Sequence, residues 1–304
     1  MNLKTILLSL ILTVSTVSHA QVTYTPIGES PLVAGEGVTG LAISSCGTAY
    51  ISVTNTQNDG NLHTIDLASG TTALIGAFGA TVRDLALDPT SGILYGACKE
   101  GNDNNWLCSI DTGTGALTTI GAMGLITGYA SLTFADDGTL YYVRTNNEGA
   151  GTIDLATGLA TELWVPEDAS ATRYGSTALG WFNNALLGHD CCDKGVGGQD
   201  FISIDTATGV ATNLGAPQGT QQIHDIAVYN GVVYAVTGGT NQGLDDGGTF
   251  GWLDLGATPE PVPPSCPAEP VPAEPVPALP LGSLWILGAL AVLIGIRQLR
   301  PATS

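Results

Sequence analysis

A fourteen-residue segment, CSIDTGTGALTTIG from Cys108 to Gly121, recurs along the chain, and this repetition is the strongest constraint on the fold. Four copies align without gaps, and a fifth, FGWLDLGATPE, stops where its last strand would begin. The Asp residues of successive copies are separated by 45, 43, 51 and 49 positions. They are Asp66, Asp111, Asp154, Asp205 and Asp254.

A second pattern precedes each copy, namely two short β-rich runs joined by a tight turn, as in HDIAVYNGVVYAV from His224 to Val236. Each unit therefore contains four strands. Four strands at a period of this length predict an all-β fold, a β-propeller of five four-stranded blades. The mature N-terminal segment 22–28, VTYTPIG, matches TTALIG and would supply the missing strand of the fifth blade. A diverged unit within 165–198 would instead give six or seven blades.

The ID-x-x-TG hairpins resemble those of a broad group of secreted bacterial propellers, which implies a fold but no activity. An Asp that appears in every blade, always before a tight turn, is what a turn requires, whereas an active site needs one carboxylate in one special place. We therefore interpret Asp111 and its counterparts as acceptors for backbone N–H groups of the turn.

The N-terminus predicts export. Residues 1–20 have a basic Lys4, an apolar core and small Ser18 and Ala20, the pattern of a cleaved signal peptide. An uncleaved anchor is the alternative. The propeller is expected to occupy residues 21–256. All 27 acidic residues and only five of the eight basic ones lie between the two chain ends, so nucleic acid is excluded as a partner.

The C-terminus predicts a spacer and an anchor. Residues 257–280 form a proline-rich spacer, and residues 281–304 hold a hydrophobic helix over 281–296 with a sparse basic tail. Together they resemble sorting signals of the PEP-CTERM and IPTL-CTERM type, although neither signature stands directly before the helix. The resemblance implies an exosortase-type processing enzyme and a Gram-negative envelope. The protein would then be exported to the outer surface or beyond, and anchored at least transiently in the inner membrane.

The longer loops, between the second and third strands of each blade, predict the functional face of the propeller. Their Asp, Asn and Gly content suits a glycan, an envelope protein or a Ca²⁺ ion, although loops need these residues for their turns as well. The preferred function is thus a binding or structural module. The candidate binding residues are Asn102, Asp103, Asn104, Asn146, Asn147, Asp245 and Asp246.

The alternative function is that of a hydrolase or lyase. Asp84 and Asp225 occupy equivalent positions at the start of two innermost strands, and His224 adjoins Asp225. These residues are candidates for general acid–base catalysis at the channel mouth. The competing interpretation is that each Asp satisfies backbone N–H groups where its strand begins.

The cysteines predict disulfides, as expected for an exported protein. Cys98 and Cys108 flank one loop and are expected to bridge it, whereas the pairing of Cys46 and Cys266 stays open. His189, Cys191 and Cys192 are candidates for a metal site, with a vicinal or other disulfide as the competing interpretation of the two cysteines.

Overall fold

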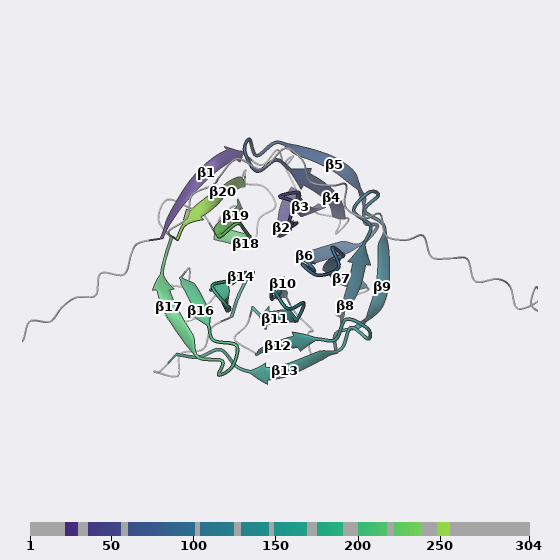
Figure 1. The fold of residues 1–304 in the computed structure, drawn as a ribbon. Helices are drawn as coiled ribbons and strands as arrows, with labels where there is room; N and C mark the ends of the chain where they lie inside the picture. Colours follow the sequence, from purple (N-terminus) through teal and green to yellow (C-terminus); the bar gives the residue numbers. More distant parts are fainter. Residues whose placement is uncertain are drawn as a thin grey trace, which may run out of the picture. The chain divides into compact units, whose positions relative to one another are not determined.

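The computed structural model shows a ring of five four-stranded antiparallel sheets, each sheet forming one blade of a β-propeller (Figure 1). The predicted fold class and the count of five blades are confirmed. Among the described residues no helix is long and apolar enough to cross a membrane. The predicted C-terminal helix and proline-rich spacer lie outside the described residues, which are 22–29, 36–55, 60–100, 104–124, 129–145, 149–168, 175–190, 200–217, 222–238 and 248–255.

The strands of each blade follow one another from the centre of the ring to its rim, and the fifth blade alone takes a strand from the other end of the chain. Blade one contains β2 (Glu36–Ile43), β3 (Ala49–Asn55), β4 (Gly60–Ile65) and β5 (Thr72–Ala77). Blade two contains β6 (Thr81–Leu87), β7 (Leu94–Glu100), β8 (Asn104–Ile110) and β9 (Leu117–Ala122). Blade three contains β10 (Ala130–Phe134), β11 (Leu140–Arg144), β12 (Ala150–Ile153) and β13 (Ala160–Trp164). Blade four contains β14 (Ala178–Phe182), β15 (Ala185–His189), β16 (Phe201–Ile204) and β17 (Ala211–Gly215). Blade five contains β18 (Gln222–Tyr229), β19 (Val232–Gly238), β20 (Thr249–Asp254) and β1 (Thr23–Glu29).

The N-terminal strand closes the ring, as predicted. β1 pairs antiparallel with β20, from Thr23 opposite Asp254 to Glu29 opposite Thr249. Tyr24 is buried, and its hydroxyl lies 2.9 Å from the Oγ1 atom of Thr249. The first and last strands of the propeller are therefore held in one sheet, which removes two open sheet edges.

The recurring Asp shapes the turn between the two outer strands of a blade. In blade two, Oδ1 of Asp111 accepts hydrogen bonds from the backbone N–H of Gly113 at 2.9 Å and of Thr114 at 2.8 Å. The Thr114 hydroxyl donates to the same oxygen at 2.9 Å. Asp66, Asp154 and Asp205 accept the same set of bonds in their own blades. The interpretation of this Asp as a turn acceptor is confirmed for these four residues, whereas the segment that follows Asp254 and Leu255 lies outside the described residues.

The recurring Gly at the end of the repeat makes room for the next blade. A Cβ atom added to Gly121 of blade two would lie 2.0 Å from the carbonyl oxygen of Thr157, in the turn of blade three. Gly76 has the same relationship with Thr114, and Gly28 of β1 meets Ser69 of blade one at 2.6 Å. Only a residue without a side chain fits at these contacts. The IG ending is thus a blade-to-blade contact as well as a strand end.

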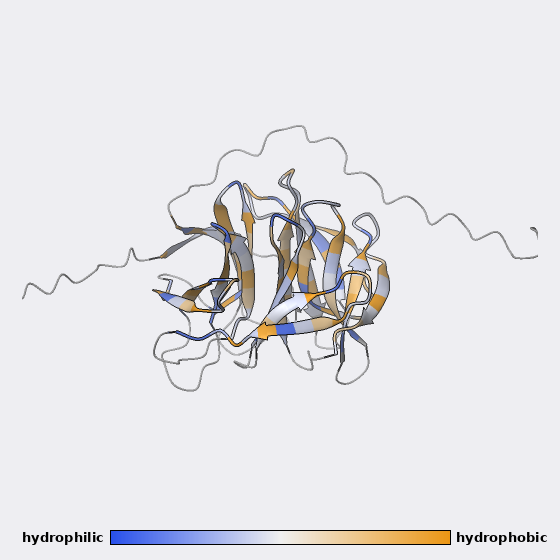
Figure 2. Ribbon diagram, turned by 60° about the horizontal axis from the view of Figure 1, so that its bottom comes forward, coloured by the Kyte–Doolittle hydropathy of each residue, from blue (hydrophilic) through white to orange (hydrophobic). Residues whose placement is uncertain are grey.

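The hydrophobic core lies between neighbouring blades. Each of the five buried clusters combines residues from two adjacent sheets, such as Leu41 of blade one with Tyr234 and Phe250 of blade five. In Figure 2 hydrophobic colouring runs along the strands through the middle of the ring. Alternating side chains on both faces of each sheet are therefore buried, which accounts for the high apolar content of a chain made of short strands.

Candidate functional site

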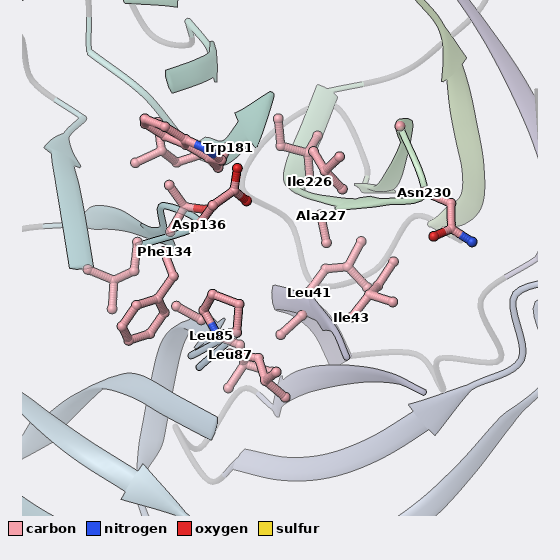
Figure 3. A pocket seen from close by; sticks show the side chains of 18 residues that line it. Leu41, Ile43, Leu85, Leu87, Phe134, Asp136, Trp181, Ile226, Ala227 and Asn230 are labelled. Carbon is pink, nitrogen blue, oxygen red and sulfur yellow. The ribbon is translucent and has the colours of Figure 1, made fainter. Parts of the chain in front are cut away.

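A pocket with a volume of about 290 Å³ lies at the centre of the ring (Figure 3). Its floor is a ring of five aliphatic side chains, one from the innermost strand of each blade. All five are at most 2% exposed, so they close the channel at this level. They are Leu41, Leu85, Leu132, Leu179 and Ile226.

The rim of the pocket is more polar than its floor. Pro89, Asp136 and Asn230 come from the tight turns after three of the innermost strands. Asn230 has a φ of 51° and Gly231 a φ of 77°, the left-handed conformations of a two-residue hairpin turn. Among the described residues that line the pocket, Asp136 is the only ionisable one, and none is basic. The mouth of the pocket therefore disfavours anions.

Trp181 provides the aromatic part of the pocket lining. Its ring stacks on Tyr141 of the neighbouring blade, with centroids 5.9 Å apart and planes 9° apart. The indole Nε1 atom is buried and has no hydrogen-bond partner among the described residues. In Figure 3, Trp181 and Asp136 project into the pocket from the same side.

Directly below the floor, one side chain at each blade junction binds the backbone of the next blade. The hydroxyls of three residues donate to carbonyl oxygens, and the carboxyls of two others accept from N–H groups. Thr39 donates to the carbonyl oxygen of Val82 at 2.6 Å, Ser131 to that of Ser176 at 3.2 Å and Thr177 to that of Ile223 at 3.4 Å. Asp84 accepts from the N–H of Leu132 at 2.6 Å, and Asp225 accepts from the N–H of Leu41 at 2.5 Å. All five junctions are thus closed near the axis of the ring.

Asp84 and Asp225 also meet each other, and we call them the acid pair. Their side chains share a hydrogen bond although they come from blades two and five. The second oxygen of each carboxyl accepts the N–H of the next residue, Leu85 at 2.7 Å and Ile226 at 2.8 Å. Gly40 of blade one adjoins the pair, and a Cβ there would lie 2.9 Å from the carbonyl carbon of Asp84. A larger residue at Gly40 would disturb this arrangement.

The acid pair is almost completely buried, with exposures of 2% for Asp84 and 1% for Asp225. Burial raises the pKa of Asp84 to about 7, although hydrogen bonds from Asp225, Leu132 and Leu85 oppose the rise. Burial and the neighbouring charge of Asp84 raise the pKa of Asp225 well above its ordinary value. Two adjacent buried carboxyls do not both ionise readily. The pair therefore holds a proton more tightly than an exposed carboxyl does.

His224 lies next to the acid pair in sequence, at an irregularity of the innermost strand. The register of β18 with β19 shifts between Ile223 and Asp225, so His224 is the extra residue of a bulge. Burial lowers the pKa of His224, and its Nε2 atom has no hydrogen-bond partner among the described residues. Among the described residues, Asp225 bonds to Asp84 and to the backbone N–H groups of Leu41 and Ile226. The geometry brings Asp84 and Asp225 together but does not join His224 to them.

Most of the loop residues predicted to bind ligands lie outside the described residues. These are Asn102, Asp103, Asn146, Asn147, Asp245 and Asp246, and the same holds for Cys191, Cys192 and Cys266. Asn104 begins β8, with its backbone opposite Glu100. His189 is fully buried, and its ring packs against Phe201 at 5.3 Å. Within the described residues, no group of three His, Cys, Asp or Glu side chains is arranged to hold a metal.

The predicted disulfide between Cys98 and Cys108 is present, with a Cα–Cα distance of 6.1 Å. It joins β7 to β8 across the end of the hairpin, on the face of the sheet that packs into the core between blades one and two. Cys46, in the turn between β2 and β3, is disulfide-bonded as well.

The pocket opens on the face of the short turns, where the sequence predicted little surface for recognition. The short turns themselves offer little surface. The innermost strands that lead into them, however, converge on the axis of the ring and leave a hollow above the aliphatic floor. Sequence reasoning missed this pocket and its Trp181 and Asp136. The repeating Leu or Ile after the Gly40, Asp84, Ser131, Ala178 and Asp225 positions is the signal that could have indicated its floor.

Comparisons with solved structures gave alignments at low sequence identity. No family model and no curated protein matches the chain. A PQQ-bound aldose sugar dehydrogenase from Streptomyces coelicolor aligns over 77% of this chain and 99% of its own, with 12% identity and a TM-score of 0.48. A protein of unknown function from Bacteroides thetaiotaomicron aligns over 77% and 76%, with 11% identity and a TM-score of 0.48. TolB from Acinetobacter baumannii aligns over 77% and 63%, with 11% identity and a TM-score of 0.46.

Proposed function

We propose that this protein is an exported binding module that holds a small ligand in the pocket at the centre of its propeller. The observation that carries the proposal is a hollow with an apolar floor, a carboxylate at its rim and the indole ring of Trp181 in its wall. A volume of about 290 Å³ is at the lower end for ligand pockets and suits a small molecule. The ligand would have an apolar body and a neutral or cationic polar group.

Export and anchoring at the cell surface belong to the same proposal. They are supported by the signal-like residues 1–20, by the resemblance of the C-terminal segment to sorting signals and by the disulfides. Processing by an exosortase-type enzyme would follow from that resemblance. Binding of a glycan, an envelope protein or Ca²⁺ by the longer loops stays a prediction from the sequence.

Three compounds of matched size test the pocket, because they differ in charge but share a benzyl or phenyl body. We expect benzylamine and benzyl alcohol to bind in calorimetric or ligand-observed NMR titrations, and benzoate to bind at least tenfold more weakly, since Asp136 repels it. Asp136→Asn should reduce this discrimination. Asp137→Asn is the matched control, because Asp137 is in the same turn but does not line the pocket.

Trp181→Ala provides the second test, because it removes the aromatic part of the pocket lining. We expect benzyl alcohol to bind this variant several-fold more weakly, since its phenyl ring loses apolar contact area. Equal binding of all three compounds, or binding unaffected by both Asp136→Asn and Trp181→Ala, would contradict the proposal.

A further inference from the structure

The acid pair lies immediately beneath the pocket and holds the floor in place. Each of its four carboxyl oxygens accepts the backbone N–H of one floor residue: Leu85 and Leu132 bind Asp84, and Leu41 and Ile226 bind Asp225. Four of the five floor residues are therefore attached to the pair. Asp84 and Asp225 each directly precede a floor residue in the chain. A change in the charge of the pair therefore occurs next to the floor that a ligand would contact.

No other described charge compensates the acid pair. Arg83 adjoins Asp84 in sequence, but its guanidinium lies 4.3 Å from the ring centroid of Tyr129 and bonds to Asn105. The remaining ionisable groups among the described side chains of β6, β18 and the strands packed against them are Tyr50, Tyr95, Lys99, Tyr229, Tyr234 and His224. None of these groups contributes to the pKa of either carboxyl. A proton lost from the pair therefore leaves a negative charge that none of these described groups balances.

Resting on the proposed function of the pocket, we propose that the acid pair couples ligand binding to pH: an organic cation in the pocket and loss of a proton from the pair favour each other. A cation above the floor stabilises the ionised pair by its Coulomb field. By thermodynamic linkage, ionisation of the pair strengthens binding of the cation by the same factor. A neutral ligand of the same size experiences no such coupling. The pair thus makes the pocket more selective for cations as the pH rises.

The experiment measures affinity at pH 5.5 and pH 8.0, using benzylamine, which stays protonated across this range, and benzyl alcohol, which has no charge. We expect benzylamine to bind about tenfold more tightly at pH 8.0 and benzyl alcohol to bind equally at both values. Equal pH dependence of the two compounds would contradict the inference, because pH would then act on the shape of the pocket. Failure of both compounds to bind at any pH would instead overturn the proposed function.

Three variants identify the titrating group. Asp84→Asn with Asp225→Asn keeps the size of the pair and one carbonyl acceptor on each side chain but removes the ionisation, and we expect it to bind benzylamine equally at both pH values. Asp136→Asn and His224→Gln should retain the pH dependence, since neither residue belongs to the pair. Loss of the dependence in either of these two variants would assign it to that residue and contradict the inference.

A reciprocal measurement needs no variant. The protonated carboxyls of the pair can be followed by infrared spectroscopy as the pH of the native protein is raised. Saturating benzylamine should lower the midpoint of this titration by about one pH unit, the shift that corresponds to a tenfold change in affinity. Benzyl alcohol should leave it in place. A midpoint unchanged by benzylamine would contradict the inference even if benzylamine binds.

Discussion

The carboxyl groups of Asp84 and Asp225 form a hydrogen bond beneath the centre of the propeller, although one belongs to the second blade and the other to the fifth. Each carboxyl also binds the N–H of a floor residue in the next blade, Leu132 or Leu41. Two acids thus connect four of the five innermost strands. Their burial and their backbone partners favour a positioning role over that of the acid and base of a hydrolase or lyase.

The acid pair should make the protein less stable as the pH rises. Because the folded-state pKa of Asp84, about 7, lies above the ordinary Asp value of about 3.9, the stability that its protonation contributes is fully present below about pH 3.9 and is lost as the pH rises through the folded pKa. Relative to the Asp84→Asn, Asp225→Asn variant, the unfolding free energy of the native protein should fall as the pH rises. The expected slope is up to about 1.4 kcal/mol per pH unit for each proton that the folded state retains and the unfolded state loses. Urea unfolding at pH 4.5, 6.0 and 7.5 measures this difference. Parallel curves for the two proteins would show that the pair does not titrate in this way.

The glycines at the blade contacts should not tolerate a side chain. Gly121→Ala places a Cβ atom 2.0 Å from the Thr157 carbonyl oxygen, and the shift needed to relieve this clash should cost about 2–3 kcal/mol of unfolding free energy. Gly113→Ala is the matched control, because the nearest atom to its added Cβ lies 3.4 Å away and Ala68 occupies the equivalent position in blade one. Thermal and chemical denaturation should show little change for Gly113→Ala. Equal losses in the two variants would reject the contact as the cause.

The disulfide should stabilise blade two by restricting the unfolded chain. Cys98 and Cys108 are separated by 10 residues, and a closed loop of this length corresponds to about 2–3 kcal/mol. Replacement of both cysteines by Ala should lower the unfolding free energy by this amount in non-reducing buffer. Dithiothreitol should then have a smaller effect on the variant than on the native protein. Peptide mapping without reductant provides the direct control, and free thiols at both positions would contradict the assignment.

Local features of the sequence were sufficient to predict the blades. Asp111 and its counterparts act within their own turns, and each bond reaches only two or three residues along the chain. The disulfide between Cys98 and Cys108 follows from a hairpin whose two strands are adjacent in sequence. The matching pattern of β1 likewise predicted how the ring closes. Local hydrogen bonding and strand periodicity are encoded in neighbouring residues, so a single sequence contains this information.

The pocket and the acid pair depend on distances across the ring, which no local pattern contains. Asp84 and Asp225 were recognisable as equivalent positions, but only the closed ring of five blades brings their carboxyls into contact. Trp181 has no distinguishing spacing, and its unpaired N–H and its position beside the channel become visible only when β14 is placed against its neighbours. The sequence by itself therefore determined the repeating blade and its closing strand. The tertiary structure alone decided what meets at the axis, because side chains from blades far apart in the chain converge there.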